Sequence, residues 1–182
     1  MGKDWYYCVA VSRAGVEKRL ATRLNNTFAK ADMDAVGFLA LCPEKDVLLQ
    51  HQGLWVKERK PMIPGYIMIR STADAPVVRT LLMDAHSGGS LLRYGDGSCA
   101  LYGRDLAYAQ WIFSYEGVIG ISTVRLVEGN AVEVVSGPLK SMHGIVTKVE
   151  KKGRKVWVDF PMMQQVIKVS IGAEFLKSDE NP

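Results

Sequence analysis

The chain has 182 residues, of which 48% are hydrophobic and 23% charged, and its formal net charge is +4. This composition is typical of a globular protein with a buried core, and it excludes a disordered or fibrous chain. No run approaches the roughly eighteen apolar residues of a membrane span, and the first residues lack the apolar core of a secretory signal. We therefore expect no membrane partner and a cytoplasmic location.

The first part of the chain alternates strand patterns with helix patterns. Residues 5–11 are β-branched and aromatic, which predicts a buried strand. Apolar residues recur at every fourth position over residues 16–28, which predicts an amphipathic helix. Residues 47–56 surround a Gln52-Gly53 turn and predict a hairpin, and residues 66–70 predict a further strand.

Two more helices are predicted in this part. Asp74 and Pro76 fit a helix start, and the next apolar residues, from Val77 to Leu82, supply its buried stripe. After a glycine-rich turn, an apolar stripe from Leu106 to Phe113 predicts a third helix that ends near Gly117. Alternating strands and helices predict an α/β sandwich over residues 1–117.

The pattern changes at residue 126. Apolar stretches become short and alternate with polar residues, and turn signals recur about every ten residues. Four or five short strands in residues 126–177 predict a small all-β barrel, because closing the sheet removes its exposed edges. We interpret residues 118–125 as an apolar linker and residues 178–182 as an acidic tail, so the expected fold class is α+β.

The positive charge is concentrated in the predicted barrel. Residues 126–177 hold 8 Lys and Arg against 5 Asp and Glu. The basic residues cluster around Gly153, and Lys140 and His143 lie in a neighbouring loop. Such residues neutralise phosphates and release counterions, so we predict an RNA-binding surface, with a solvated hairpin tip as the alternative. Its residues are Lys140, His143, Lys148, Lys151, Lys152, Arg154 and Lys155.

Motifs in the first part resemble the amino-terminal (NGN) domain of NusG-type transcription elongation factors. These motifs are Trp5-Tyr6 at the start of a strand, Glu17-Lys18-Arg19 in the following helix and Pro64-Gly65-Tyr66 before a central strand. The resemblance implies an antiparallel sheet flanked by helices. It also implies that this domain binds the β′ clamp helices of RNA polymerase and promotes processive elongation or antitermination.

A polymerase interface of this kind needs an exposed apolar patch with a polar rim. Tyr66 and Ile63 are the best candidates, because they flank a stiff Pro-Gly corner and Tyr often anchors interfaces. Burial in the core is the alternative for these residues. The full candidate set, with Thr80 as a contact to the opposite jaw of the polymerase, is Tyr7, Ile63, Pro64, Gly65, Tyr66, Met68, Thr80 and Leu92.

The later part resembles the KOW domain of the same family, an SH3-like barrel. The likeness lies in residues 129–134, 136–140 and 144–146, and within the family residues 136–140 and 166–169 resemble the specialised LoaP-like paralogues. Ser141 departs from the glycine that many relatives have there. KOW domains of the family bind ribosomal protein, Rho or RNA, and the basic turn suits a structured RNA hairpin better than unpaired bases. We expect a monomer; the alternative function is a ribosome-associated or translational RNA-binding protein.

No reaction centre is indicated by the sequence. His51, His86 and His143 do not pair with Cys or carboxylate residues at metal-ligand spacing. The three cysteines, an odd number without CxxC spacing, are interpreted as buried thiols in a reducing compartment. Cys8 and Cys42 lie in apolar strand patterns without an activating base. We therefore expect no metal, no cofactor and no enzymatic activity.

Overall fold

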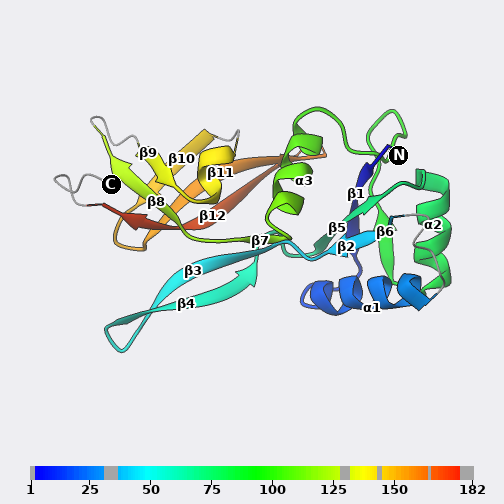
Figure 1. The fold of residues 1–182 in the computed structure, drawn as a ribbon, viewed down its shortest axis with the longest axis horizontal. Coiled ribbons are helices and arrows are strands. Elements are labelled where there is room, and N and C mark those ends of the chain that lie inside the picture. The colour runs from blue at the N-terminus through cyan, green and yellow to red at the C-terminus, as the bar shows by residue number, and fades with distance from the viewer. Residues whose placement is uncertain (1–2, 31–36, 128–131, 143–144, 164, 177–182) are drawn as a thin grey trace. The chain divides into compact units, whose positions relative to one another are not determined.

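The computed structural model describes residues 3–30, 37–127, 132–142, 145–163 and 165–176 (Figure 1). The chain divides into two compact units. Unit 1 consists of residues 1–43 and 63–116, and unit 2 consists of residues 44–62 and 117–182. No helix in the described part of the chain is long and apolar enough to cross a membrane.

Unit 1 contains an antiparallel sheet of four strands in the order β2-β5-β1-β6. Strands β1 and β5 are central and pair from Trp5 opposite Ser71 to Ala10 opposite Tyr66. The strands are β1 (Trp5–Val11), β2 (Leu39–Leu41), β5 (Tyr66–Ser71) and β6 (Gly89–Leu91).

Helices cover both faces of this sheet. Alternate residues of β1, such as Tyr7 and Val9, pack with α1 and α2 in one buried cluster. The neighbouring Tyr6 faces the other side, where its ring lies 5.3 Å from that of Phe113 in α3. Figure 1 shows α2 and α3 on opposite sides of the sheet. The helices are α1 (Glu17–Lys30), α2 (Ala75–Asp84) and α3 (Gly103–Ser114).

Unit 2 begins with a long hairpin, β3 (Glu44–His51) and β4 (Leu54–Pro61), and β7 (Val118–Ile119) pairs parallel to β3. The hairpin turns at Gln52 and Gly53, as the sequence predicts. It packs on strand β12, where a Cβ at Gly172 would lie 2.6 Å from the carbonyl oxygen of Asp46. Only glycine allows this close approach of the two strands.

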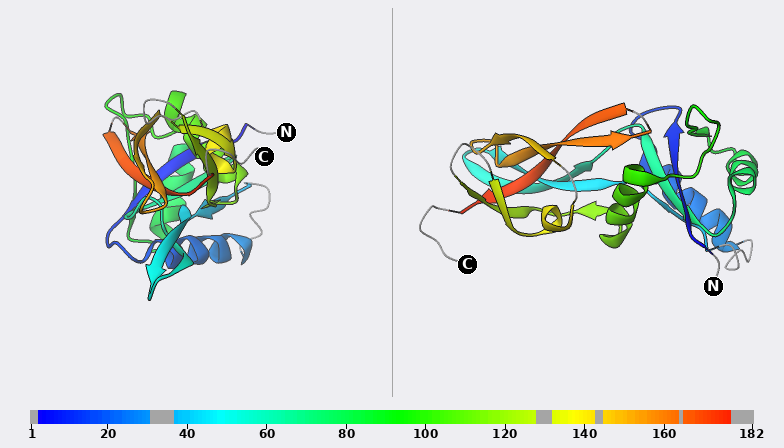
Figure 2. Two further views of the ribbon diagram at one scale, coloured as in Figure 1. Left: turned by 90° about the vertical axis from the view of Figure 1, so that its left-hand side faces the viewer. Right: turned by 90° about the horizontal axis from the view of Figure 1, so that it is seen from above.

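The rest of unit 2 is a curled sheet of five strands in the order β10-β11-β12-β8-β9 (Figure 2). Its buried core includes Val156, Val158, Phe160 and Ile171. The strands are β8 (Ser122–Leu126), β9 (Val132–Ser136), β10 (Ile145–Glu150), β11 (Lys155–Met162) and β12 (Gln165–Phe175), with a 3-10 turn, η3, at Pro138–Ser141.

The mixed α/β fold with three helices is confirmed, and so are the predicted helices and the strand at residues 5–11. The linker expected at residues 118–125 instead contains β7 and most of β8, because its β-branched residues complete two sheets. The hairpin at 44–62, expected in the first domain, groups with unit 2. The domain boundaries at 117 and 126 stay a prediction, and the acidic tail lies outside the described residues.

Candidate interaction surfaces

The Pro64-Gly65-Tyr66 corner is held in place by a buried carboxylate. Glu17, at the start of α1, is 2% exposed and accepts hydrogen bonds from the backbone N–H groups of Gly15 at 2.7 Å and Gly65 at 2.6 Å. Gly65 has φ of 89°, a left-handed conformation that favours glycine. Pro64 is exposed and Tyr66 half-buried at this corner. The corner is thus a rigid, partly apolar projection of unit 1.

Three residues of the predicted polymerase patch are buried, so the prediction that they are exposed is wrong. Tyr7, Ile63 and Met68 have exposed fractions of 1%, 2% and 0%. For Tyr7 and Met68 the reason is that β1 and β5 are the central strands and helices cover both faces of the sheet. The Tyr7 hydroxyl donates to the carbonyl of Ala73 at 2.8 Å, and burial raises the pKa of Tyr7 to about 12.

The other predicted patch residues do reach the surface. Leu92 is half-buried, and its N–H donates to the carbonyl of Cys8 at 2.9 Å, beside β1. Tyr66 pairs with Ala10 on the other side of the same strand. Thr80 is exposed on α2, and its hydroxyl donates to the carbonyl of Pro76 at 3.2 Å. The apolar surface here is smaller than the sequence predicts and centres on Pro64, Tyr66 and Leu92.

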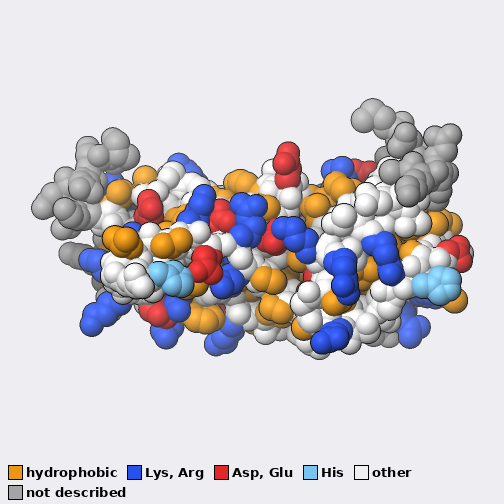
Figure 3. All heavy atoms as spheres, turned by 90° about the horizontal axis from the view of Figure 1, so that it is seen from below, with side chains coloured by type: hydrophobic (Ala, Val, Ile, Leu, Met, Phe, Trp, Pro, Cys, Tyr) orange, Lys and Arg blue, Asp and Glu red, His pale blue; other side chains and the backbone are white. Residues whose placement is uncertain are grey.

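The structure also shows a basic surface on α1 that the sequence analysis did not identify. The basic residues on the polar face of this helix could have indicated it. Figure 3 shows Lys and Arg side chains over this helix. Lys18, Arg19 and Arg23 are all exposed there. Arg23 donates to the carbonyls of Ala85 and His86 at 2.9 and 2.6 Å. Arg23 therefore joins α1 to the turn after α2.

The basic turn between β10 and β11 is organised around one carboxylate. Glu150 pairs with Lys155 at 3.1 Å and accepts a hydrogen bond from the Trp157 indole at 3.3 Å. These donors lower the pKa of Glu150 below its usual value. A Cβ at Gly153 would lie 2.5 Å from a Glu150 carboxylate oxygen, so the Glu150 side chain packs closely against the backbone of the turn. The turn is thus an ordered structure.

The seven predicted RNA-binding residues are not equivalent. Lys151 and Lys152 are exposed, and Lys148 is exposed and lies 4.0 Å from Glu150. Arg154 is only half-exposed, with its guanidinium 4.7 Å from the Trp55 ring of β4, and Lys155 pairs with Glu150. Within this turn, Lys148, Lys151 and Lys152 are thus the exposed basic residues. His143 lies outside the described residues.

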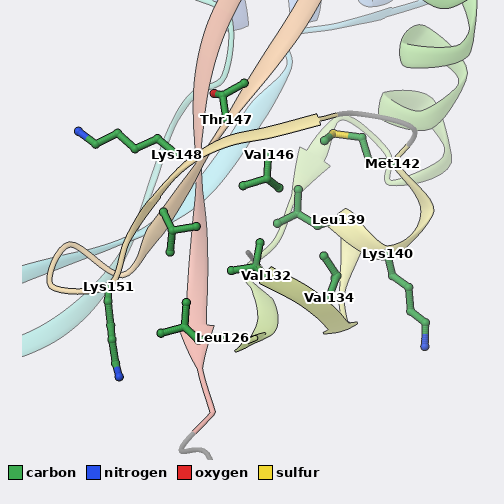
Figure 4. A pocket seen from close by; sticks show the side chains of 11 residues that line it. Leu126, Val132, Val134, Leu139, Lys140, Met142, Val146, Thr147, Lys148 and Lys151 are labelled. Atoms are coloured by element: carbon green, nitrogen blue, oxygen red, sulfur yellow. The ribbon is translucent and has the colours of Figure 1, made fainter. Parts of the chain in front are cut away.

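An apolar groove lies between β9 and β10, and the sequence analysis missed it. Its volume is about 850 Å³. Figure 4 shows apolar side chains from both strands and η3 pointing toward one another, while lysine side chains extend outward. The apolar lining includes Leu126, Val132, Val134, Leu139, Val146 and Val149, and the lysines are Lys140, Lys148 and Lys151.

The cysteines differ in burial. Cys8 and Cys99 are buried, as predicted, whereas Cys42 is half-buried. Burial, with the nearby Asp105 carboxylate, raises the pKa of the Cys8 thiol to about 12, which makes it a poor nucleophile. Within the described ranges, no three His, Cys, Asp or Glu side chains gather as metal ligands would.

Comparison with known proteins gives a likeness in fold. No family model matches the chain, and no curated protein matches it. Among solved structures, one described as showing domain interaction in Thermotoga maritima NusG matches with a TM-score of 0.54 at 13% sequence identity. The match covers 93% of this chain and 94% of that one. The chain therefore has a NusG-like fold.

Proposed function

We propose that the protein is a transcription elongation factor of the NusG type, in which an NGN-like domain binds RNA polymerase and a KOW-like barrel binds RNA. The NusG-like fold over 93% of the chain is the observation that carries this proposal. The protein acts by binding and not by catalysis, and it needs no metal or cofactor. Its effect is to promote processive elongation or antitermination, in the manner of a LoaP-like paralogue.

The polymerase contact is assigned to the corner of unit 1. Tyr66 supports this role because it is half-buried beside the exposed Pro64, with Glu17 holding the backbone at Gly65. A rigid aromatic side chain loses little conformational entropy on binding and buries a large apolar area. Leu92, whose N–H donates to the carbonyl of Cys8 beside β1, extends this surface toward β6, and Thr80 on α2 is assigned to the opposite jaw of the polymerase. The target is the clamp helices of the β′ subunit.

The RNA contact is assigned to Lys148, Lys151 and Lys152. Lys140, in η3 of the same unit, is a further candidate. Their ammonium groups are exposed, and the Glu150 interactions hold the turn that carries two of them. Contacts of this type bind phosphates without reading base sequence. A structured RNA, recognised by its backbone and groove shape, is therefore the expected ligand.

The direct test is transcription by the purified polymerase of the source organism across an intrinsic terminator, on a template that carries the native upstream leader. Added protein should increase readthrough, Tyr66→Ala should abolish the increase, and Val166→Ala, at an exposed position of β12, should leave it unchanged. Unchanged readthrough and pausing with the native protein would contradict the proposal. Co-purification with ribosomes and not with polymerase would favour a ribosome-associated RNA-binding protein instead.

A further inference from the structure

One side chain of the basic turn in unit 2 lies on the β3–β4 hairpin. The guanidinium carbon of Arg154 is 4.7 Å from the centre of the Trp55 ring in β4. This distance is within the range of about 6 Å for a cation–π interaction. Both side chains are half-exposed, so the pair lies at the surface of the unit. A planar cation therefore covers an aromatic ring where the turn meets the hairpin.

Both partners of this pair are anchored to strand β12. The N–H of Ala173 in β12 donates to the carbonyl of Arg154 at 2.8 Å. On the hairpin side, the Lys45 ammonium in β3 donates to the hydroxyl of Ser170 in β12 at 3.2 Å. Strand β3 pairs along its whole length with β4, which carries Trp55. One strand thus holds together two side chains that are about 100 residues apart in sequence.

The backbone of Arg154 is also unusual. Its φ is 46°, in the left-handed region that residues with a side chain seldom adopt. Its N–H donates to the carbonyl of Lys151 at 3.1 Å, which closes the turn. Left-handed residues other than glycine cluster at functional sites. An arginine at a position that favours glycine indicates a role for its side chain.

Two exposed lysines precede this arginine in the same turn. They are Lys151 and Lys152. The Cα atoms of Lys152 and Arg154 are at most about 7 Å apart, because each residue of an extended chain spans about 3.3–3.6 Å. RNA phosphates that contact the lysines therefore bring neighbouring bases close to the guanidinium. A base inside a stem is stacked on its neighbours, whereas an unpaired base is free to stack on an arginine plane.

We propose that Arg154, held in place by Trp55, is a platform on which an unpaired base of the bound RNA stacks. The ligand is then a stem whose phosphates meet the lysines, with an unpaired nucleotide beside it in a bulge or a loop. Every base has a π-face, so the platform selects an unpaired nucleotide and not a base sequence. Trp55 acts through Arg154 and is a positioning residue. This inference rests on the proposed RNA contact of the turn.

The test uses the full chain and two RNA hairpins that share one stem. One hairpin carries an unpaired adenosine beside the stem, and the other carries an abasic nucleotide at that position. The two probes have the same phosphates and differ only in the base. Filter binding should show the adenosine hairpin bound at least about fivefold more tightly, which is the lower end of the contribution of one stacked base.

Variants locate the platform. Arg154→Lys keeps the charge but removes the planar group, so the preference for adenosine should fall below about twofold while the salt dependence of binding stays unchanged. Trp55→Ala should reduce the preference in the same way, whereas Trp55→Phe keeps a ring under the guanidinium and should retain most of it. Leu54→Ala is the matched control and should keep the full preference, because Leu54 is 72% exposed and lies on the opposite face of β4 from Trp55.

The two RNA proposals fail in different ways. Equal binding of the two hairpins by the native protein would overturn the platform and leave the phosphate contact of the lysines intact. A preference that survives Arg154→Lys would also overturn the platform, because the base would then stack elsewhere. Lys151→Glu combined with Lys152→Glu should weaken both hairpins equally and preserve the preference. Failure of the native protein to bind either hairpin would overturn the proposed RNA contact and the platform with it.

Discussion

Strands β1 and β5 of unit 1 are covered on both faces and paired on both edges, whereas β9 and β10 of unit 2 each have one unpaired edge in the described chain. In unit 1 this leaves Tyr7 and Met68 in the core and only the ends of the strands for binding. In unit 2 apolar side chains, mainly valine and leucine, line an open groove. Position in the sheet, more than residue type, therefore decides which apolar side chains are available to a partner.

The largest expected effect comes from a central strand of unit 1. Met68→Ala removes a fully buried side chain from β5 and should lower the free energy of unfolding by about 2–5 kcal/mol. Met83→Ala, at a position 70% exposed on α2, should change it by less than about 0.5 kcal/mol. Urea denaturation followed by tryptophan fluorescence measures both. Equal effects of the two substitutions would contradict the assignment of Met68 to the core.

A smaller loss of stability is expected at the corner of unit 1. Glu17→Gln keeps the shape of the side chain but weakens the two hydrogen bonds from Gly15 and Gly65. Because the group is buried, we expect a loss of about 1–3 kcal/mol in the free energy of unfolding. Asp84→Asn, at an exposed position, is the control and should be neutral in the same denaturation experiment. Glu17→Gln should also weaken polymerase binding, because the side chain holds the Gly65 backbone less firmly. Unchanged binding would show that this corner does not form the polymerase contact.

The sequence predicts the central elements of unit 1 well and their exposure poorly. The strand at residues 5–11 follows from its β-branched and aromatic residues, and the helix at α1 follows from its apolar period. That β1 lies in the middle of the sheet depends on pairing with β5 and β6, which are about 60 and 80 residues away in sequence. Local periodicity contains no information on such pairing, so Tyr7 and Met68 could not be distinguished from surface residues.

In unit 2 the basic turn was predictable because its residues are adjacent in sequence, but its internal order was not. Arg154 lies against Trp55, which is about 100 residues earlier and belongs to the hairpin that sequence analysis placed in the first domain. The groove was missed because the residues that line it come from separate segments of the chain. Alternating residues predicted a closed barrel, and only the strand order shows that β9 and β10 do not pair in the described chain.

Within the basic turn, the exposed lysines should matter most for RNA. Lys151→Glu combined with Lys152→Glu should weaken binding of a leader RNA hairpin and reduce the slope of log affinity against log salt concentration by about 2, or roughly 1 for each lysine. Arg154→Gln should change the slope less, because that guanidinium lies on the Trp55 ring. Filter binding at several salt concentrations measures the slopes. A larger effect of Arg154→Gln would show that its contact with Trp55 opens on binding.

The smallest effect tests whether the turn is ordered in solution. Hydrogen bonds from Trp157 and Lys155 lower the pKa of Glu150 from 4.5, so its carboxylate stays charged to lower pH than an isolated one. The stability that it contributes is present above the usual pKa and is lost as pH falls through the lowered value. The indole N–H resonance of Trp157 should therefore titrate below pH 4.5, and Glu150→Gln should remove that titration. A resonance that titrates at 4.5 or above, or that is unaffected by Glu150→Gln, would mean that the turn is a solvated hairpin tip. The exposed lysines of unit 2 would then not differ from Lys155, which pairs with Glu150, or from Arg154, which lies on the Trp55 ring.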